Sequence, residues 1–258
     1  MTRPFMFLTL LIPGKDGPGQ NIDVYLRPLI DDLKLLWSEG VETWDVSLRR
    51  NFYMRACLLW TINDFPAYGI LSGWSTHGRL ACPCCMENTK AFRLHFSGKP
   101  CWFDCHRRHL PPDHPFRRQR NSFVIGRVER DGPPPIISGE EIESRLDALP
   151  DHPIGLWLKS KERLPGFGDS HNWRRKCIFW ELPYWSRLLV RHNVDVMHIE
   201  KNLFENLFYM MMGAKGRKNK DDAKGRKDMV LHCNRPDLEL RDNGGRLLMP
   251  RATYTLTR

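Results

Sequence analysis

The chain of 258 residues contains no run of 18 or more apolar residues, so no transmembrane helix is expected. The N-terminal stretch MTRPFMFLTLLIPG has one charged residue and a short apolar run. No small-residue cleavage site follows that run, which ends in Pro-Gly, so a signal peptide is not predicted. Because neither a transmembrane helix nor a signal peptide is predicted, we expect no membrane partner. The sequence also has no internal repeat.

Acidic residues are the minority among the charged ones. The 30 Asp and Glu stand against 40 Lys and Arg, which gives a formal net charge of +10. A basic surplus of this size favours a polyanionic partner, with nucleic acid the first candidate, although a basic protein without such a partner stays open. At 41% hydrophobic residues, with 9 Trp and 13 Phe, the composition supports a packed core and argues against disorder throughout.

Cysteine is clustered. Five of the eight cysteines fall between residues 82 and 105. Because no signal peptide is predicted, this cluster and its neighbouring histidines favour a metal site in a reducing compartment over disulfides. Cys82 and Cys85 form a CxxC pair that could supply one side of a zinc tetrahedron. The nearest further donors are Cys101, Cys105, His106 and His109. A set of free thiols is the alternative.

The first 64 residues follow a strand, helix, strand pattern. The continuous apolar run 4–13 predicts a strand buried on both faces, and helical spacing predicts a helix from Asp23, its expected cap, to Gly40. Residues 55–63 predict a second buried strand. This order indicates a βαβ unit with two parallel strands and a right-handed crossover. Residues 41–54, between the helix and the second strand, are expected to be partly helical.

Later segments give separate signals. Ser138 and Glu141 form a capping box at the start of a predicted short helix, 138–149. The aromatic-rich stretch 178–193 is expected to be packed, and residues 198–213 predict an amphipathic helix closed by Gly213. The charged stretch 214–227 is expected to be a solvated linker.

Three features carry candidate chemistry. Asp64 ends a predicted parallel strand, where α/β folds place functional groups, and with a second carboxylate it could hold Mg²⁺. A cap on the following turn is the simpler interpretation of Asp64 from spacing alone. Asp195 and His198, three residues apart, could bind metal, hold DNA or cap the long helix. The stretch FRRQRNSFVIGRVER suits phosphate contacts or an ordinary solvated loop.

Five segments in a fixed order resemble the plant CACTA (En/Spm-type) transposases. They are FMFLTLLIPG, IDVYLRPLIDDLKLLW, LLWTINDFPAYGILSGWSTHGRLACPCC, HRRHLPPDHPFR and HNVDVMHIEKNLFENL. The resemblance runs from about residue 4 to 212, with a looser tail to 258. It implies an α/β fold with a partial RNase H-like (DDE-type) catalytic core and a partly helical, Cys/His zinc-binding insertion.

The chemistry implied by this resemblance is metal-dependent DNA transposition. Two divalent ions, Mg²⁺ or Mn²⁺, would lie between carboxylates and activate water or a DNA 3′-hydroxyl. DNA at the transposon ends is the implied partner, with other transposon-encoded or host proteins as further candidates. The nucleus is the implied location, and a structural Zn²⁺ is the second implied cofactor.

The resemblance also assigns residues. Asp64 matches the second acidic position, which makes it the predicted catalytic residue. His106 matches the histidine of a GHRR-like motif, in which Cys105 here replaces the glycine. Asp195 and His198 match a DxxH-like segment, and the fourth zinc ligand stays unassigned. The full set of predicted metal ligands is Asp64, Cys82, Cys85, His106, Asp195 and His198.

Four regions are expected on this basis. Residues 1–77 would be the partial RNase H-like core, a strand, helix and strand ending at the second catalytic Asp. Residues 78–137 would be the Cys/His-rich insertion, 138–213 its helical part, and 214–258 a basic linker and tail.

The resemblance places the first Asp upstream of these residues and the final Glu downstream. Glu200 and Glu205 do not match that final position. One carboxylate cannot organise two Mg²⁺ ions, so we expect a transposase fragment that does not cut DNA by itself. Two alternatives are a non-enzymatic, zinc-containing DNA- or protein-binding module and a non-functional relic.

Overall fold

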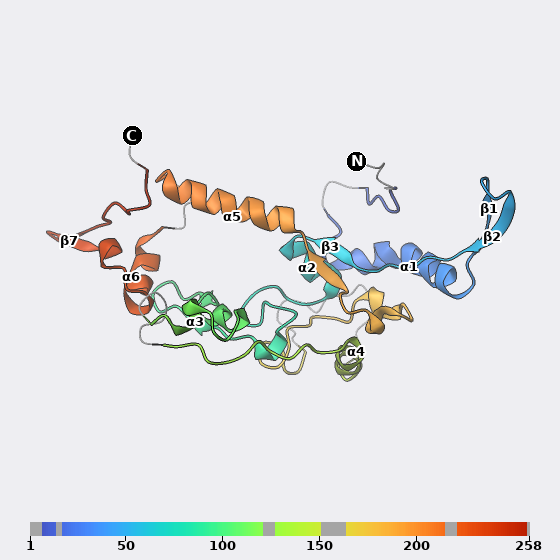
Figure 1. The fold of residues 1–258 in the computed structure, drawn as a ribbon, viewed down its shortest axis with the longest axis horizontal. Coiled ribbons are helices and arrows are strands. Elements are labelled where there is room, and N and C mark those ends of the chain that lie inside the picture. Colours follow the sequence, from blue (N-terminus) through green and yellow to red (C-terminus); the bar gives the residue numbers. More distant parts are fainter. Residues whose placement is uncertain (1–6, 14–16, 121–126, 151–163, 215–220, 257–258) are drawn as a thin grey trace. The chain divides into compact units, whose positions relative to one another are not determined.

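The computed structural model describes residues 7–13, 17–120, 127–150, 164–214 and 221–256 (Figure 1). Within these ranges helices are mixed with small two-stranded sheets, which is consistent with the α/β class. The chain divides into two compact units, Met1–Glu87 with Ile136–Asp195 and Asn88–Pro135 with Val196–Arg258. No helix in the described part of the chain is both long and apolar enough to cross a membrane.

The described part of the first unit contains three α-helices, two strand pairs and short 3₁₀ turns. The helices are α1 (Ile22–Ser38), α2 (Phe65–Ser72) and α4 (Gly139–Asp147). The strands are β1 (Val41–Asp45), β2 (Arg50–Met54), β3 (Thr61–Asn63) and β6 (His192–Val194). The 3₁₀ turns are η1 (Gly19–Asn21), η4 (Ile178–Glu181) and η5 (Trp185–Arg187), and η2 (Met86–Asn88) lies where the first unit passes into the second.

Helix α1 confirms the predicted helix but corrects its cap. Asp23 lies inside the helix, fully buried, and its carboxylate pairs with the buried guanidinium of Arg175. The residue before α1, Asn21, makes no side-chain capping bond. The prediction failed because the partner of Asp23 is 152 positions away in the sequence. Gly40 ends the helix as expected, since its φ of +79° suits glycine and its N–H donates to the Leu35 carbonyl at 2.9 Å.

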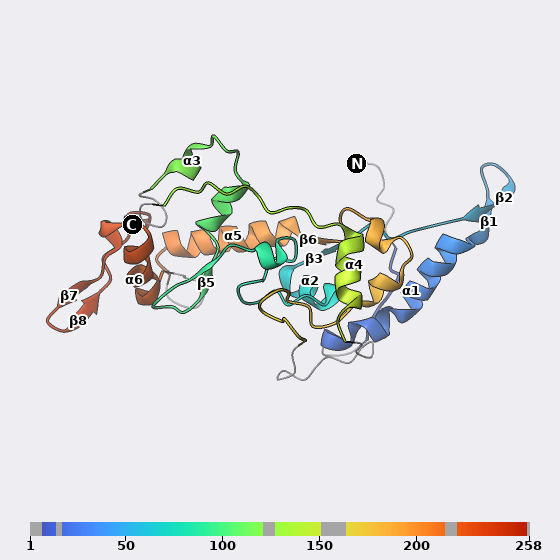
Figure 2. The same ribbon diagram turned by 90° about the horizontal axis from the view of Figure 1, so that it is seen from below.

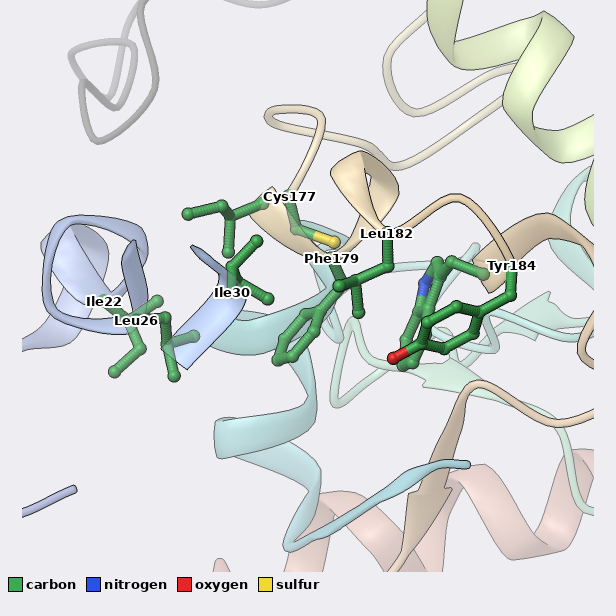
Figure 3. Close-up of a cluster of buried hydrophobic side chains, with 9 residues drawn as sticks. Ile22, Leu26, Ile30, Cys177, Phe179, Leu182 and Tyr184 are labelled. Atoms are coloured by element: carbon green, nitrogen blue, oxygen red, sulfur yellow. The ribbon is translucent and has the colours of Figure 1, made fainter. Parts of the chain in front are cut away.

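The main core lies between α1 and the aromatic-rich stretch (Figure 3). Helical spacing turns Ile22, Leu26 and Ile30 toward Phe179 and Leu182. The remaining buried members are Cys177, Ile178, Tyr184 and Trp185. The prediction that residues 178–193 are packed is therefore confirmed for the part that enters this cluster.

A second cluster joins α4 to the segment that follows α2. Trp74 and Trp173 meet edge to face with ring centres 5.1 Å apart, and the Trp74 indole N–H donates to the Leu80 carbonyl at 3.0 Å. Ile142 and Leu146 of α4 pack against them. The predicted capping box is confirmed in part, because the Ser138 hydroxyl accepts the Glu141 N–H at 3.2 Å.

Residues 41–54 form a hairpin rather than a helix. Strands β1 and β2 pair antiparallel from Val41↔Met54 to Asp45↔Arg50. At the turn, the Asp45 carboxylate accepts the N–H groups of Ser47 and Leu48. In both views the hairpin extends beyond the end of α1 (Figures 1 and 2). The aromatic and β-branched residues of these strands explain the result, since they favour extended backbone over helix.

The predicted βαβ unit is wrong in the described residues. Residues 7–13 form no strand, and residues 4–6 of that prediction lie outside the described ranges. Leu10 and Ile12 pack against the main core while Phe7, Leu8 and Leu11 are exposed, so the apolar run covers the core without pairing. The second predicted strand shrinks to β3, whose parallel partner is β6.

The described part of the second unit contains one long helix, several short helices and 3₁₀ turns, and two β-hairpins. Its helices are α3 (Pro115–Arg118), α5 (Val196–Met211) and α6 (Ala223–His232), with 3₁₀ turns η3 (Cys105–His109) and η6 (Pro236–Leu238). Its strands are β4 (Phe92–Arg93), β5 (Pro100–Cys101), β7 (Arg241–Asn243) and β8 (Arg246–Leu248). The predicted long helix is confirmed as α5. Residues 215–220 of the predicted linker lie outside the described ranges, and α6 begins within its remainder.

The buried Asp228 fastens α6 to the β4–β5 hairpin. Its two carboxylate oxygens accept the backbone N–H groups of Phe96 and Ser97 at 2.8 and 3.0 Å. Burial raises the pKa of the Asp228 carboxyl, whereas these hydrogen bonds lower it. The hydrogen bonds prevail, so the pKa of Asp228 lies below its usual range. The hairpin and the helix are thus held by an ionised carboxylate.

We predict that Ile30→Ala lowers the free energy of unfolding by about 2–5 kcal/mol, because the side chain is fully buried in the main core and its loss leaves a cavity. Urea denaturation followed by circular dichroism measures the change. The matched control is Leu35→Ala on the same helix, where the side chain is exposed and the loss should be much smaller. Equal losses in the two variants would contradict the assigned core face of α1.

Candidate functional site

The parallel pair β3–β6 brings two of the predicted metal residues to one edge. Its register aligns Thr61 with His192 and Asn63 with Val194, and the Asp195 N–H extends the pairing by donating to the Asn63 carbonyl at 2.7 Å. Asp64 directly follows β3 and Asp195 directly follows β6. Because the carboxyl ends of parallel strands meet at the same edge, these two residues are neighbours there.

Asp64 also caps helix α2. One oxygen of its carboxylate accepts the Ala67 N–H at 2.8 Å, and Pro66 occupies an early helical position that suits proline. The negative charge lies at the positive end of the helix dipole. The capping interpretation of Asp64 is therefore confirmed. A carboxylate has about four acceptor positions, so one capping bond leaves others for a cation.

His192 joins the strand pair to the main core. Its Nδ1 lies 2.7 Å from the Thr61 hydroxyl oxygen, and its ring packs against those of Tyr68, Phe179 and Trp185. Burial, and then the nearby guanidinium groups of Arg191 and Arg175, lower the pKa of His192 to about 3. His192 is therefore a neutral imidazole at the first position of β6, the strand that Asp195 follows. The sequence reasoning missed this residue, and its only signal was a place three positions before Asp195.

The CPCC segment forms a tight turn. The Cys82 sulfur accepts the Cys85 N–H at 3.4 Å, and the Met86 N–H donates to the Cys82 carbonyl at 3.0 Å. Hydrogen bonds from the Cys84 and Cys85 thiols hold the pKa of Cys82 well below its usual range, while the same pairing raises the pKa of Cys84. A backbone N–H on sulfur stabilises a thiolate, the form that binds zinc. The turn is thus chemically suited to half of a metal site.

The predicted metal ligands are divided between the two units. Cys82 and Cys85 belong to the first unit, whereas His106 on η3 and His198 on α5 belong to the second. Across the described ranges, no three His, Cys, Asp or Glu side chains are grouped so that they could hold a metal ion. The zinc-binding insertion is therefore still a prediction.

Arg117, in the basic stretch, has a structural role. Its side chain is buried, and its guanidinium donates to the backbone carbonyls of Arg108, Leu110 and Asp131 at 2.7–3.0 Å. A guanidinium held in this way cannot reach a phosphate. The phosphate-contact interpretation is therefore wrong at this position, and residues 121–126 of the stretch lie outside the described ranges.

Comparison with known families decides the relationship. The model of the transposase family tnp2 matches residues 1–149, more than half of the chain. The chain belongs to this transposase family. Searches of curated proteins and of solved structures gave no significant match. The matched region of this tnp2-family chain contains Asp64 and the CPCC turn. Membership of the family implies a transposase-related role and DNA binding in general.

We predict that Asp64→Ala destabilises the protein by about 1 kcal/mol, because α2 loses its capping acceptor, whereas Asp64→Asn changes stability much less since asparagine caps equally well. Thermal and urea unfolding of the two variants and the wild type measure the difference. The cap is refuted if alanine and asparagine have the same effect.

We predict that the free energy of unfolding falls as the pH is lowered from about 6.5 toward 3, because unfolded His192 takes up a proton that the folded protein excludes. Between pH 7 and pH 5 the contribution of His192 is about 1–2 kcal/mol. Urea unfolding at both pH values measures it. His192→Asn should lose less stability over this interval than the wild type, and a parallel loss in both proteins would contradict the assignment.

Proposed function

We propose that this chain forms part of the DNA-processing centre of a DDE-type transposase of the CACTA (En/Spm) kind. The observation that carries the proposal is the parallel β3–β6 pair, which sets Asp64 and Asp195 side by side at one sheet edge. Family membership supports the coarser transposase role. Within this function Asp64 is the catalytic carboxylate and Asp195 its partner.

Two neighbouring carboxylates are the oxygen ligands that Mg²⁺ and Mn²⁺ prefer, so the donor chemistry of this edge fits such an ion. A bound ion would supply Lewis-acid activation of the attacking oxygen at a phosphodiester. The chain's own contribution is positional. The Asp64 carboxylate is held by the Ala67 N–H, and the backbone of Asp195 is held by its bond to the Asn63 carbonyl.

The remaining assignments follow the same proposal. DNA at the transposon ends is the substrate, which the net charge of +10 favours, and the nucleus is the location. Cys82 and Cys85, in their sulfur-stabilising turn, would supply two ligands of a structural Zn²⁺, and its other ligands stay unassigned. The same turn favours a second candidate function, a non-enzymatic zinc-containing DNA- or protein-binding module.

Fluorescence anisotropy of a labelled DNA duplex, with Mn²⁺ or with EDTA, tests the proposal. A cation held by Asp64 and Asp195 would supply positive charge toward the DNA phosphates, so Mn²⁺ should raise the DNA affinity of the wild type several-fold. Asp64→Asn and Asp195→Asn should each abolish the Mn²⁺ effect, and the first keeps the α2 cap intact. Asp32→Asn, at an exposed position of α1, is the matched control and should behave as the wild type.

Two results would overturn the metal-dependent centre. The first is salt-dependent DNA binding that Mn²⁺ leaves unchanged, which would favour the non-enzymatic module. The second is an equal loss of the Mn²⁺ effect in Asp32→Asn, which would show that any lost negative charge suffices.

A further inference from the structure

We propose that His106 and His109 together form a two-histidine chelate for a borderline divalent cation such as Zn²⁺. Both side chains are exposed, and their ring centres lie 5.9 Å apart. The proposal concerns the second unit by itself and rests on the geometry of η3, not on the proposed transposase function. In this chelate the second ligand, His109, comes from the same unit as His106.

The geometry of η3 puts both imidazoles on one side. A 3₁₀ helix has three residues per turn, so residues i and i+3 eclipse, and His106 and His109 have this spacing. Two imidazoles that share one Zn²⁺ at Zn–N distances of about 2.0–2.1 Å hold their ring centres roughly 5–6 Å apart. The observed separation of the ring centres falls in this range. Imidazole nitrogen is also a ligand type that suits Zn²⁺, Cu²⁺ and Ni²⁺.

The two arginines between these histidines fix the turn. Arg107 is buried, and its guanidinium donates to the Asp104 carboxylate at 2.5 Å and to the carbonyls of Phe116 and Gln119 at 2.8 and 3.0 Å. Arg108 donates to the Gly132 carbonyl at 2.7 Å. These bonds hold the backbone before any cation arrives, which lowers the ordering cost of chelation.

This arrangement divides the HRRH motif into two functions. The arginines serve the fold and the histidines face solvent. Two protein nitrogens leave the other positions of a cation to water. We therefore expect an accessible, exchangeable site rather than a closed structural one, since structural zinc sites use four protein ligands.

Nuclear magnetic resonance of the imidazole ring nitrogens during a Zn²⁺ titration tests the proposal, because it reports each histidine apart from the eight thiols. In the wild type, the His106 and His109 resonances should shift together with one Kd. His106→Gln should raise the Kd measured at His109 at least tenfold, and His109→Gln should do the same at His106. His77→Gln, which removes an exposed histidine of the first unit, should leave both Kd values unchanged.

Different outcomes would overturn the chelate. The two rings could titrate with separate Kd values, the Kd at His109 could be unaffected by His106→Gln, or neither ring could shift at millimolar Zn²⁺. Since both side chains are exposed, the variants should fold, and far-ultraviolet circular dichroism of each variant checks this.

Discussion

The buried pair of Asp23 and Arg175 is the constraint on which the first unit depends. Arg175 also donates to the Ile70 carbonyl at 2.6 Å, so one guanidinium joins α1, α2 and the segment that leads into η4. Removing one partner of such a pair leaves an uncompensated buried charge, which is strongly destabilising. The pair thus holds α2, and with it Asp64, in a fixed relation to the main core.

Local signals were enough for the long helices. Helical spacing identified α1, α4 and α5, because each depends on residues within a few turns, although the predicted N-terminal cap of α1 was wrong. The strand pair at the candidate site could not be found in this way. Thr61 and His192 are 131 positions apart, and three-residue strands are too short to show a period. Asp64 was recognised from its place at a strand end, whereas its nearness to Asp195 needed the structure.

Tertiary contacts also decide which charged side chains are available to bind a partner. Arg117 belongs to a stretch whose composition suggests phosphate binding, yet it is buried and donates to backbone carbonyls, as does the buried Arg107 of the HRRH motif. Glu181 is an acidic side chain that is already paired. Its hydrogen bonds from Arg27 and Lys34 outweigh the effect of partial burial and lower its pKa to about 2. A sequence gives the number of charges but not which of them are already paired.

The cap on α2 limits what residue 64 can be. Helix capping is satisfied by Asn, Ser, Thr or Asp, whereas glutamate is not among the favoured caps. Cation binding, under the proposed function, needs a carboxylate at the strand end, which excludes the neutral members of that set. Aspartate alone meets both demands. Fewer residue types should therefore occur at position 64 in nature than either the capping role or the cation-binding role would allow by itself. An engineered protein without this aspartate would need one substitution to cap the helix and another to restore the carboxylate.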